Sequence, residues 1–135
     1  MTGLSEANET IRVALLMAAT EPAKAVALLS TALSLAEQRG STADVAAIAK
    51  HAGAICQGRG DFQSALVFFR KAISMSPDDP HLGLVLGQLL DDLGQTDEAR
   101  RTLQRSVELL IKAKEDDVVV VAQRLIREID SRGGP

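Results

Sequence analysis

Apolar side chains recur along this chain every three or four residues, and short polar or turn-forming segments separate the stretches in which they do so. This spacing is typical of amphipathic α-helices. Prolines and glycines mark the breaks, because proline fits the first turn of a helix and glycine adopts the left-handed conformation that ends one. Pro22, Pro77 and Pro80 follow breaks in the pattern, and Gly40 and Gly94 close two of the stretches. The pattern predicts an all-α chain of about seven helices.

Most of the predicted helices begin at polar residues whose side-chain oxygens can accept hydrogen bonds from free backbone amides, and one begins at a proline. The predicted capping or opening residues, in chain order, are Ser5, Pro22, Ser41 or Thr42, Asp61, Asp79, Thr96, and Asp116 or Asp117. The run Val118 to Val121 is ambiguous, because four β-branched residues favour a strand. A lone strand would have no partner in this chain, so we expect a helix there as well.

Two stretches of the chain superimpose at a spacing of 34 residues. The matched pairs are Gly53 with Gly87, Gly60 with Gly94, Ala65 with Ala99, Phe69 with Leu103, and Ala72 with Ser106. A fixed period of this length, with small and large residues returning in register, indicates a helical-hairpin repeat. Small residues let two helix backbones approach, and large ones fill the space between neighbouring hairpins. Such repeats stack into a solenoid whose surface, rather than a catalytic cleft, usually carries the function.

Residues 46–79 resemble the tetratricopeptide repeat in the order of their small and large residues. The match rests on Gly53, on the turn Gly60-Asp61-Phe62, and on Ala65, Phe69, Ala72 and Pro77. Residues 80–111 repeat the pattern, except that Ile111 stands where the family has its closing proline. The helix is therefore predicted to continue through this position. A looser first copy spans about residues 5–40.

The resemblance implies a right-handed helical-hairpin solenoid of about seven helices that fills residues 1–135 as one domain. The hairpins are expected at about residues 5–40, 42–76 and 79–115. A capping helix is expected at about residues 117–131.

In this family the first helix of each hairpin lines the inner, concave face. Carried over to this chain, the expected groove residues are Ala47, Lys50, Ala54, Gln57, His81, Leu84, Gln88 and Asp91. The polar members can hydrogen-bond a peptide, while Ala54 and Leu84 leave room for an apolar side chain. The alternative is that these are ordinary solvated positions on amphipathic helices. A clamp for a terminal carboxylate is not expected, because Asp91 would repel it.

The last predicted helix has more apolar residues than a capping helix needs. One apolar stripe contains Val118, Val121, Ala122, Leu125 and Ile129. Three further residues lie off this stripe, namely Val119, Val120 and Ile126. We expect them on the outer side, where they would favour a partner or a second copy of the chain.

Candidates for catalysis or metal binding have simpler interpretations. Cys56 occupies a position where the repeat packs a bulky side chain, which predicts a buried, inert thiol. His81 lies near Asp78 and Asp79, but these aspartates are at capping positions and no second histidine or cysteine is close. No phosphate-binding glycine motif is present. We therefore expect no catalytic, cofactor-binding or metal site.

Composition narrows the class of partner. The 135 residues are 46% apolar and 24% charged with a formal charge of −3, so no basic surface for nucleic acid is expected. Arg100, Arg101 and Arg105 cluster, but acidic neighbours predict a salt-bridged face. The single cysteine fits a reducing compartment. No apolar run is long enough for a membrane span, and the acidic start argues against a signal peptide. The cytoplasm is the expected location.

These observations predict a non-catalytic protein–protein interaction module: an adaptor, chaperone or assembly factor that binds a peptide or helix of a partner protein. The alternative is a structural scaffold that self-assembles by stacking through its terminal helices. An enzyme, or a regulatory fragment of one, fits the sequence least.

Overall fold

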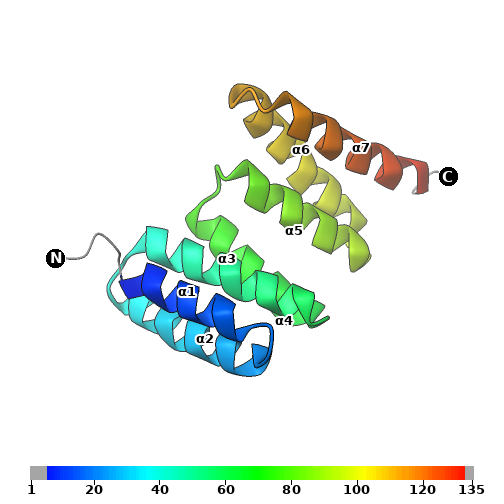
Figure 1. The fold of residues 1–135 in the computed structure, drawn as a ribbon. Helices are drawn as coiled ribbons and strands as arrows, with labels where there is room; N and C mark the ends of the chain where they lie inside the picture. Colours follow the sequence, from blue (N-terminus) through cyan, green and yellow to red (C-terminus); the bar gives the residue numbers. More distant parts are fainter. Residues whose placement is uncertain (1–5, 133–135) are drawn as a thin grey trace. The chain divides into compact units, whose positions relative to one another are not determined.

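The computed structural model describes residues 6–132, and every regular element in that range is an α-helix (Figure 1). The helices are α1 (Glu6–Met17), α2 (Pro22–Gln38), α3 (Thr42–Gly58), α4 (Phe62–Met75), α5 (Pro80–Asp92), α6 (Thr96–Lys112) and α7 (Asp116–Arg132). The all-α architecture predicted from the sequence is confirmed. The run Val118 to Val121 lies inside α7, and α6 continues through Ile111, as predicted.

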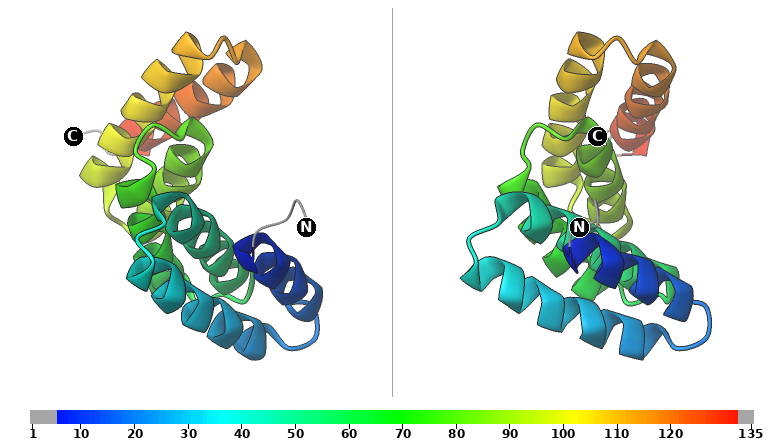
Figure 2. Two further views of the ribbon diagram at one scale, coloured as in Figure 1. Left: turned by 90° about the vertical axis from the view of Figure 1, so that its left-hand side faces the viewer. Right: turned by 60° about the vertical axis from the view of Figure 1, so that its left-hand side comes forward.

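The helices group into two compact units that divide between Ser76 and Pro77. In unit 1, α1 packs on α2 and α3, α2 packs on α3, and α3 packs on α4. In unit 2, α5 packs on α6, and α7 packs on α6 with a smaller contact to α5. Figure 2 shows the consecutive helices of each unit running as neighbouring hairpins. That residues 1–135 form one domain stays a prediction.

Proline and aspartate begin the helices where the sequence predicts. Pro22 and Pro80 occupy the first turns of α2 and α5. The Asp61 carboxylate accepts a hydrogen bond from the Ser64 amide, at 3.2 Å. The Asp79 carboxylate accepts two, from the amides of the residues that follow Pro80, each at 3.1 Å. Ser5, the predicted cap of the first helix, lies outside the described residues.

Four helices end in one and the same backbone motif. A residue with a positive φ follows each of them: Gly40 (69°) after α2, Gly60 (80°) after α3, Gly94 (82°) after α5 and Lys114 (59°) after α6. In each case two successive amides bond back to carbonyls of the last turn, a pattern that satisfies backbone groups the helix leaves free. Lys114 adopts this conformation against the steric preference of a residue that carries a Cβ.

The start of α7 differs from the prediction. Asp116 or Asp117 was expected as the capping residue, but both lie inside the first turn of the helix. Because the chain turns at Lys114, the next residue, Glu115, takes the capping position of α7. Its carbonyl oxygen accepts hydrogen bonds from the amides of Val118 and Val119, at 3.1 and 3.0 Å. The two aspartates still lie at the positive end of the helix dipole.

In each unit a glycine lies in close contact with a large side chain. A Cβ added to Gly53 would lie 2.8 Å from Cε1 of Phe69, and one added to Gly87 would lie 2.6 Å from Cγ of Leu103. Neither distance leaves room for a methyl group. The predicted role of these glycines, close approach of two helices, is confirmed.

The face of α7 that packs inward is rotated relative to the prediction. Val119 is only 9% exposed, so its expected place on the outer side is wrong. Val121, assigned to the inner stripe, is 38% exposed, whereas Val120 is 60% exposed as predicted. Ile126 is half-buried. The buried side of α7 is formed chiefly by Val119, Ala122 and Ile129.

Candidate functional site

The four groove residues expected on α3 lie along one side of that helix in unit 1. Lys50 and Ala54 are exposed, and Ala47 and Gln57 are half-buried. Their spacing of three and four residues places them one above the other along the helix. The buried residues of α3 point elsewhere, into the contacts with α2 and α4. The four residues therefore form a row in which the small Ala47 and Ala54 alternate with the polar Lys50 and Gln57.

Ala54 belongs to an open depression on unit 1, where the C-terminal end of α1, the start of α2 and the C-terminal half of α3 meet. The depression is lined by Leu15, Ala18, Ala19, Pro22, Ala54, Ile55, Gly58 and Arg59. Most of this lining is apolar, and Leu15 is 46% exposed although it is large and apolar. The shape and lining suit an apolar side chain from a partner.

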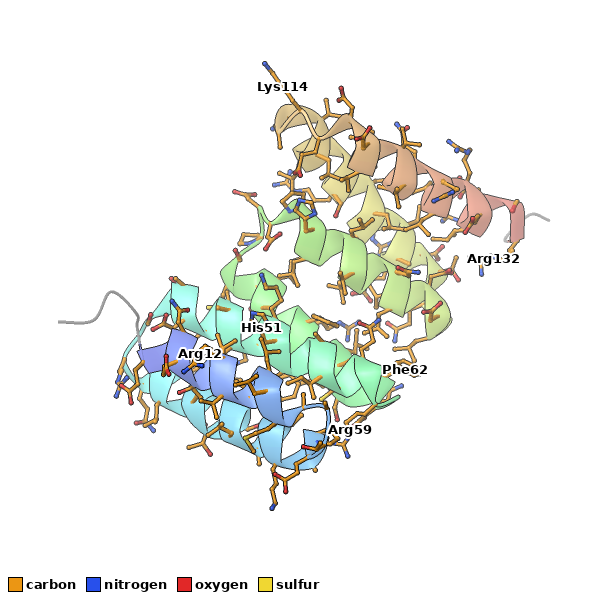
Figure 3. The ribbon with its side chains drawn as sticks, in the orientation of Figure 1. Arg12, His51, Arg59, Phe62, Lys114 and Arg132 are labelled. Carbon is orange, nitrogen blue, oxygen red and sulfur yellow. The ribbon has the colours of Figure 1, made fainter. Side chains whose placement is uncertain are left out.

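Basic side chains lie in and beside this depression. Arg59, labelled in Figure 3, follows the last turn of α3 and contributes to the lining. Lys50 is exposed one turn before Ala54 on the same helix. His51 adds no charge at neutral pH, because burial, and to a smaller extent the nearby Lys50, lowers the pKa of its imidazole below the ordinary value of 6.5. Arg59 and Lys50 therefore favour an acidic group next to the apolar one.

The corresponding row on α5, in unit 2, is engaged at both ends by residues at the ends of α7. His81 Nε2 lies 3.0 Å from each carboxylate oxygen of Glu115, the capping residue of α7. Arg132, in the last turn of α7, donates a hydrogen bond to the Asp91 carboxylate at 2.6 Å. Two of the predicted groove residues thus hold α7 against α5.

The other two residues of the α5 row differ in their surroundings. Leu84 packs against the buried cluster of Leu110, Val119 and Ala122. Gln88 is exposed and takes no part in these contacts with α7. In unit 2, therefore, three members of the predicted row contact α7 or the residue that precedes it, and Gln88 is an exposed polar member outside these contacts.

Two residues of this site were not predicted from the sequence. Leu15 and Arg59 were not among the expected groove residues, although both line the depression next to Ala54. The signal for Leu15 was available, because α1 is itself the first helix of a hairpin and its exposed apolar residues could have been added to the row. Arg59 lies in a turn, outside the helical positions that the resemblance covers.

The residues considered for metal binding and catalysis lie in surroundings that do not favour either role. Across residues 6–132 no three histidine, cysteine or acidic side chains come together in a way that could hold a metal ion. Cys56 is buried, as predicted, and burial raises the pKa of its thiol. A nucleophilic role would require the thiolate, which this environment disfavours. None of the described helices is long and apolar enough to cross a membrane.

The predicted salt-bridged face on α6 is present. Arg100 pairs with Asp97 at 3.3 Å and with Asp130 of α7 at 2.7 Å. Arg105 pairs with Asp78 at 3.0 Å and approaches Glu108 at 3.8 Å. These arginines are thus paired with carboxylates in unit 2.

Comparison with known proteins agrees with this architecture. A family model described as the tetratricopeptide repeat matches residues 58–114, which run from the end of α3 past the end of α6. The resemblance inferred from the sequence is thereby confirmed. No curated protein matches the chain in sequence.

Solved structures extend the fold comparison beyond the matched repeats. The chain is similar to the Yersinia enterocolitica type III secretion translocator chaperone SycD, with a TM-score of 0.77 and 15% identity, over 96% of this chain and 88% of that one. It also matches MamA (41-end) from Desulfovibrio magneticus RS-1 over 99% of this chain and 100% of that one. That second match has a TM-score of 0.41 and 11% identity, too weak to support an argument. The likeness to SycD shows a shared helical-hairpin solenoid fold.

Proposed function

We propose that this chain is a non-catalytic protein–protein interaction module that binds an extended peptide or a helix of a partner protein. The observation that carries the proposal is the depression on unit 1, where Leu15 of α1 and Ala54 of α3 leave apolar surface open beside Arg59. Repeat solenoids commonly bind partners through their extended surface. Residues 58–114 match the tetratricopeptide repeat, which supports a role of this kind.

The lining of the depression indicates the chemistry of the bound segment. An apolar side chain of the partner would lie against Leu15 and Ala54, where both surfaces lose contact with water. An acidic residue of the same segment would pair with Arg59 or Lys50, which would set its orientation more than its affinity. Gln57 would supply a hydrogen bond to the peptide backbone. We expect the protein to do this in the cytoplasm, where its single thiol stays reduced.

The biological form of this role is an adaptor, a chaperone or an assembly factor. SycD, which shares the fold, is described as a translocator chaperone. We favour a chaperone-like role for this chain on that ground, with the partner still to be identified by experiment.

Two replacements of alanine by arginine, one inside the depression and one outside it, test the proposal. Partners captured on the immobilised chain would be identified, purified and titrated against each variant by calorimetry. Ala54→Arg fills the depression and should weaken binding by about tenfold or more, the loss expected when a central contact is removed. Ala27→Arg makes the same change at an exposed alanine of α2, which lies in the same unit and does not line the depression. It should bind like the parent.

Two further results show whether the depression is the binding site and whether the row on α5 takes part. Equal binding by parent, Ala54→Arg and Ala27→Arg would rule out the depression as the site. Lys50→Ala and Gln88→Ala ask whether the rows on α3 and α5 both take part. A loss with the first and none with the second would restrict the site to unit 1.

A further inference from the structure

The outer side of α7 carries a charge pattern in which acidic and basic residues lie two turns apart. Asp116 and Asp117 are in the first turn, and Arg124 follows later in the helix; all three are exposed. Between them Val120 is 60% exposed and Val121 is 38% exposed. None of the ion pairs found within residues 6–132 engages Asp117 or Arg124.

These residues share one face of the helix. Asp117 and Arg124 are seven residues apart, about two turns, so they lie on the same side with Val120 and Val121 between them. The opposite side of α7, with Val119, packs on α6 and α5 within unit 2. The face that Asp117, Val120, Val121 and Arg124 form is called the outer α7 face below.

We propose that two copies of this chain associate through the outer α7 face, with the two α7 helices antiparallel. A two-fold axis between Val120 and Val121 brings Asp117 of each copy opposite Arg124 of the other. Both copies then use the same surface patch, as a symmetric dimer requires. The valines meet at the centre and lose contact with water.

The charges select the orientation. In a parallel arrangement Asp117 would face its own counterpart and Arg124 would face another arginine, and both contacts repel. In the antiparallel arrangement both contacts attract. One helical face buries far less surface than a permanent dimer needs, so association is weak and depends on protein concentration. Salt weakens it further by screening the exposed pairs.

Of the residues that the sequence analysis assigned to self-association, Val120 alone lies on this face. Val119 is buried against the rest of unit 2, and Ile126 is half-buried. The structure thus moves the proposed contact to Val120 and Val121 and adds the two charged residues that fix the pairing.

Charge reversal tests the arrangement. Sedimentation equilibrium would be measured over a wide range of concentrations for the parent, for Asp117→Arg, for Arg124→Asp and for the variant that carries both changes. Each single reversal turns two attractions into two repulsions and should raise the dissociation constant of the dimer by about tenfold. The double variant restores both attractions and should associate like the parent. An equimolar mixture of the two single variants should also form dimers.

Controls separate association from folding. Asp116→Arg places the same charge in the same helical turn, but about 100° away around the helix, and should associate like the parent. Circular dichroism confirms that each variant keeps its helices. Val120→Glu should abolish association, because it sets two like charges beside the axis, whereas Gln123→Glu should leave it unchanged.

Several results would overturn the proposal. These are a parent that stays monomeric at every concentration and salt level, single reversals that associate like the parent, or a double variant that remains monomeric. The inference is independent of partner binding on unit 1. Ala54→Arg should leave the dimer unchanged, so the two proposals can fail separately.

Discussion

The hairpins α3–α4 and α5–α6 share a 34-residue register, yet they fill the space beside the two glycines at matching positions differently. Gly53 faces the flat ring of Phe69, whose atoms Cε1, Cδ1 and Cγ would lie 2.8, 2.9 and 3.1 Å from an added Cβ. Gly87 faces the branch point of Leu103, with Cγ at 2.6 Å and Cδ2 at 2.7 Å. The leucine contact is closer and is made nearer to the backbone of its own helix.

The repeat period therefore determines where a small residue must stand, whereas the side chain opposite it determines how much the contact can yield. A ring can tilt about its bond to Cβ and withdraw its edge. A Cγ atom sits one bond from Cβ and moves only with the rotamer or the helix. The two hairpins should thus respond unequally to the same substitution.

Gly87→Ala should show the largest effect. Overpacking of a filled core costs about 1–3 kcal/mol, offset in part by the better helix propensity of alanine, worth about 1 kcal/mol. We expect Gly87→Ala to lower the free energy of unfolding by up to about 2 kcal/mol and Gly53→Ala by less. Chemical denaturation followed by circular dichroism measures both.

Gly58→Ala is the matched control. An added Cβ there meets nothing within 4 Å, so the change should be neutral or stabilising. If Gly53→Ala were the costlier of the two core substitutions, the distinction drawn between Phe69 and Leu103 would be wrong.

The helix caps extend the comparison to the starts of α4 and α5. Asp61 accepts one backbone hydrogen bond and Asp79 accepts two. Removal of a capping side chain costs typically about 1 kcal/mol, within a range of roughly 0.5–2. We expect Asp79→Ala to lie in the upper part of this range and Asp61→Ala in the lower part, by the same denaturation measurement. Ser41→Ala is the control, because Ser41 makes no side-chain capping bond to α3. Equal losses of unfolding free energy at all three positions would contradict the capping roles assigned to Asp61 and Asp79.

The smallest effect is expected at the end of α6. Lys114 holds the left-handed conformation that glycine holds after α2, α3 and α5. Lys114→Gly removes a strain of roughly 1–2 kcal/mol but adds freedom to the unfolded chain, worth roughly 0.5–1. The net expectation is a stabilisation of about 0.5 kcal/mol, seen as a small rise in melting temperature. Gly94→Ala puts a Cβ on the left-handed residue after α5 and should lower the melting temperature. A melting temperature that fell with Lys114→Gly would contradict the strain argument.

The helix boundaries could be predicted because proline, glycine and aspartate each have a local backbone reason for their positions. Gly60 and Asp61 specify a turn and a cap without help from the rest of the chain. Lys114 gives no such signal, since nothing in a lysine marks a positive φ. The start of α7 was consequently misplaced by a residue or two.

The orientation of α7 was beyond local reasoning for a different reason. Four valines in succession, Val118 to Val121, leave no polar residue to show which side faces water. Both the predicted stripe and the observed one fit helical spacing. The choice depends on contacts such as Arg132 with Asp91, 41 residues away in sequence. The same holds for the α5 row of the candidate site, whose ends are covered by α7. The α3 row could be placed from the repeat alone.

The buried Cys56 gives unit 1 a property that unit 2 lacks. It is the only cysteine of the chain, and it lies in α3 with 1% of its surface exposed. An alkylating reagent can reach it only during moments when α3 separates from its neighbours. The rate of labelling under native conditions therefore reports the opening of unit 1 alone, with no probe added to the chain.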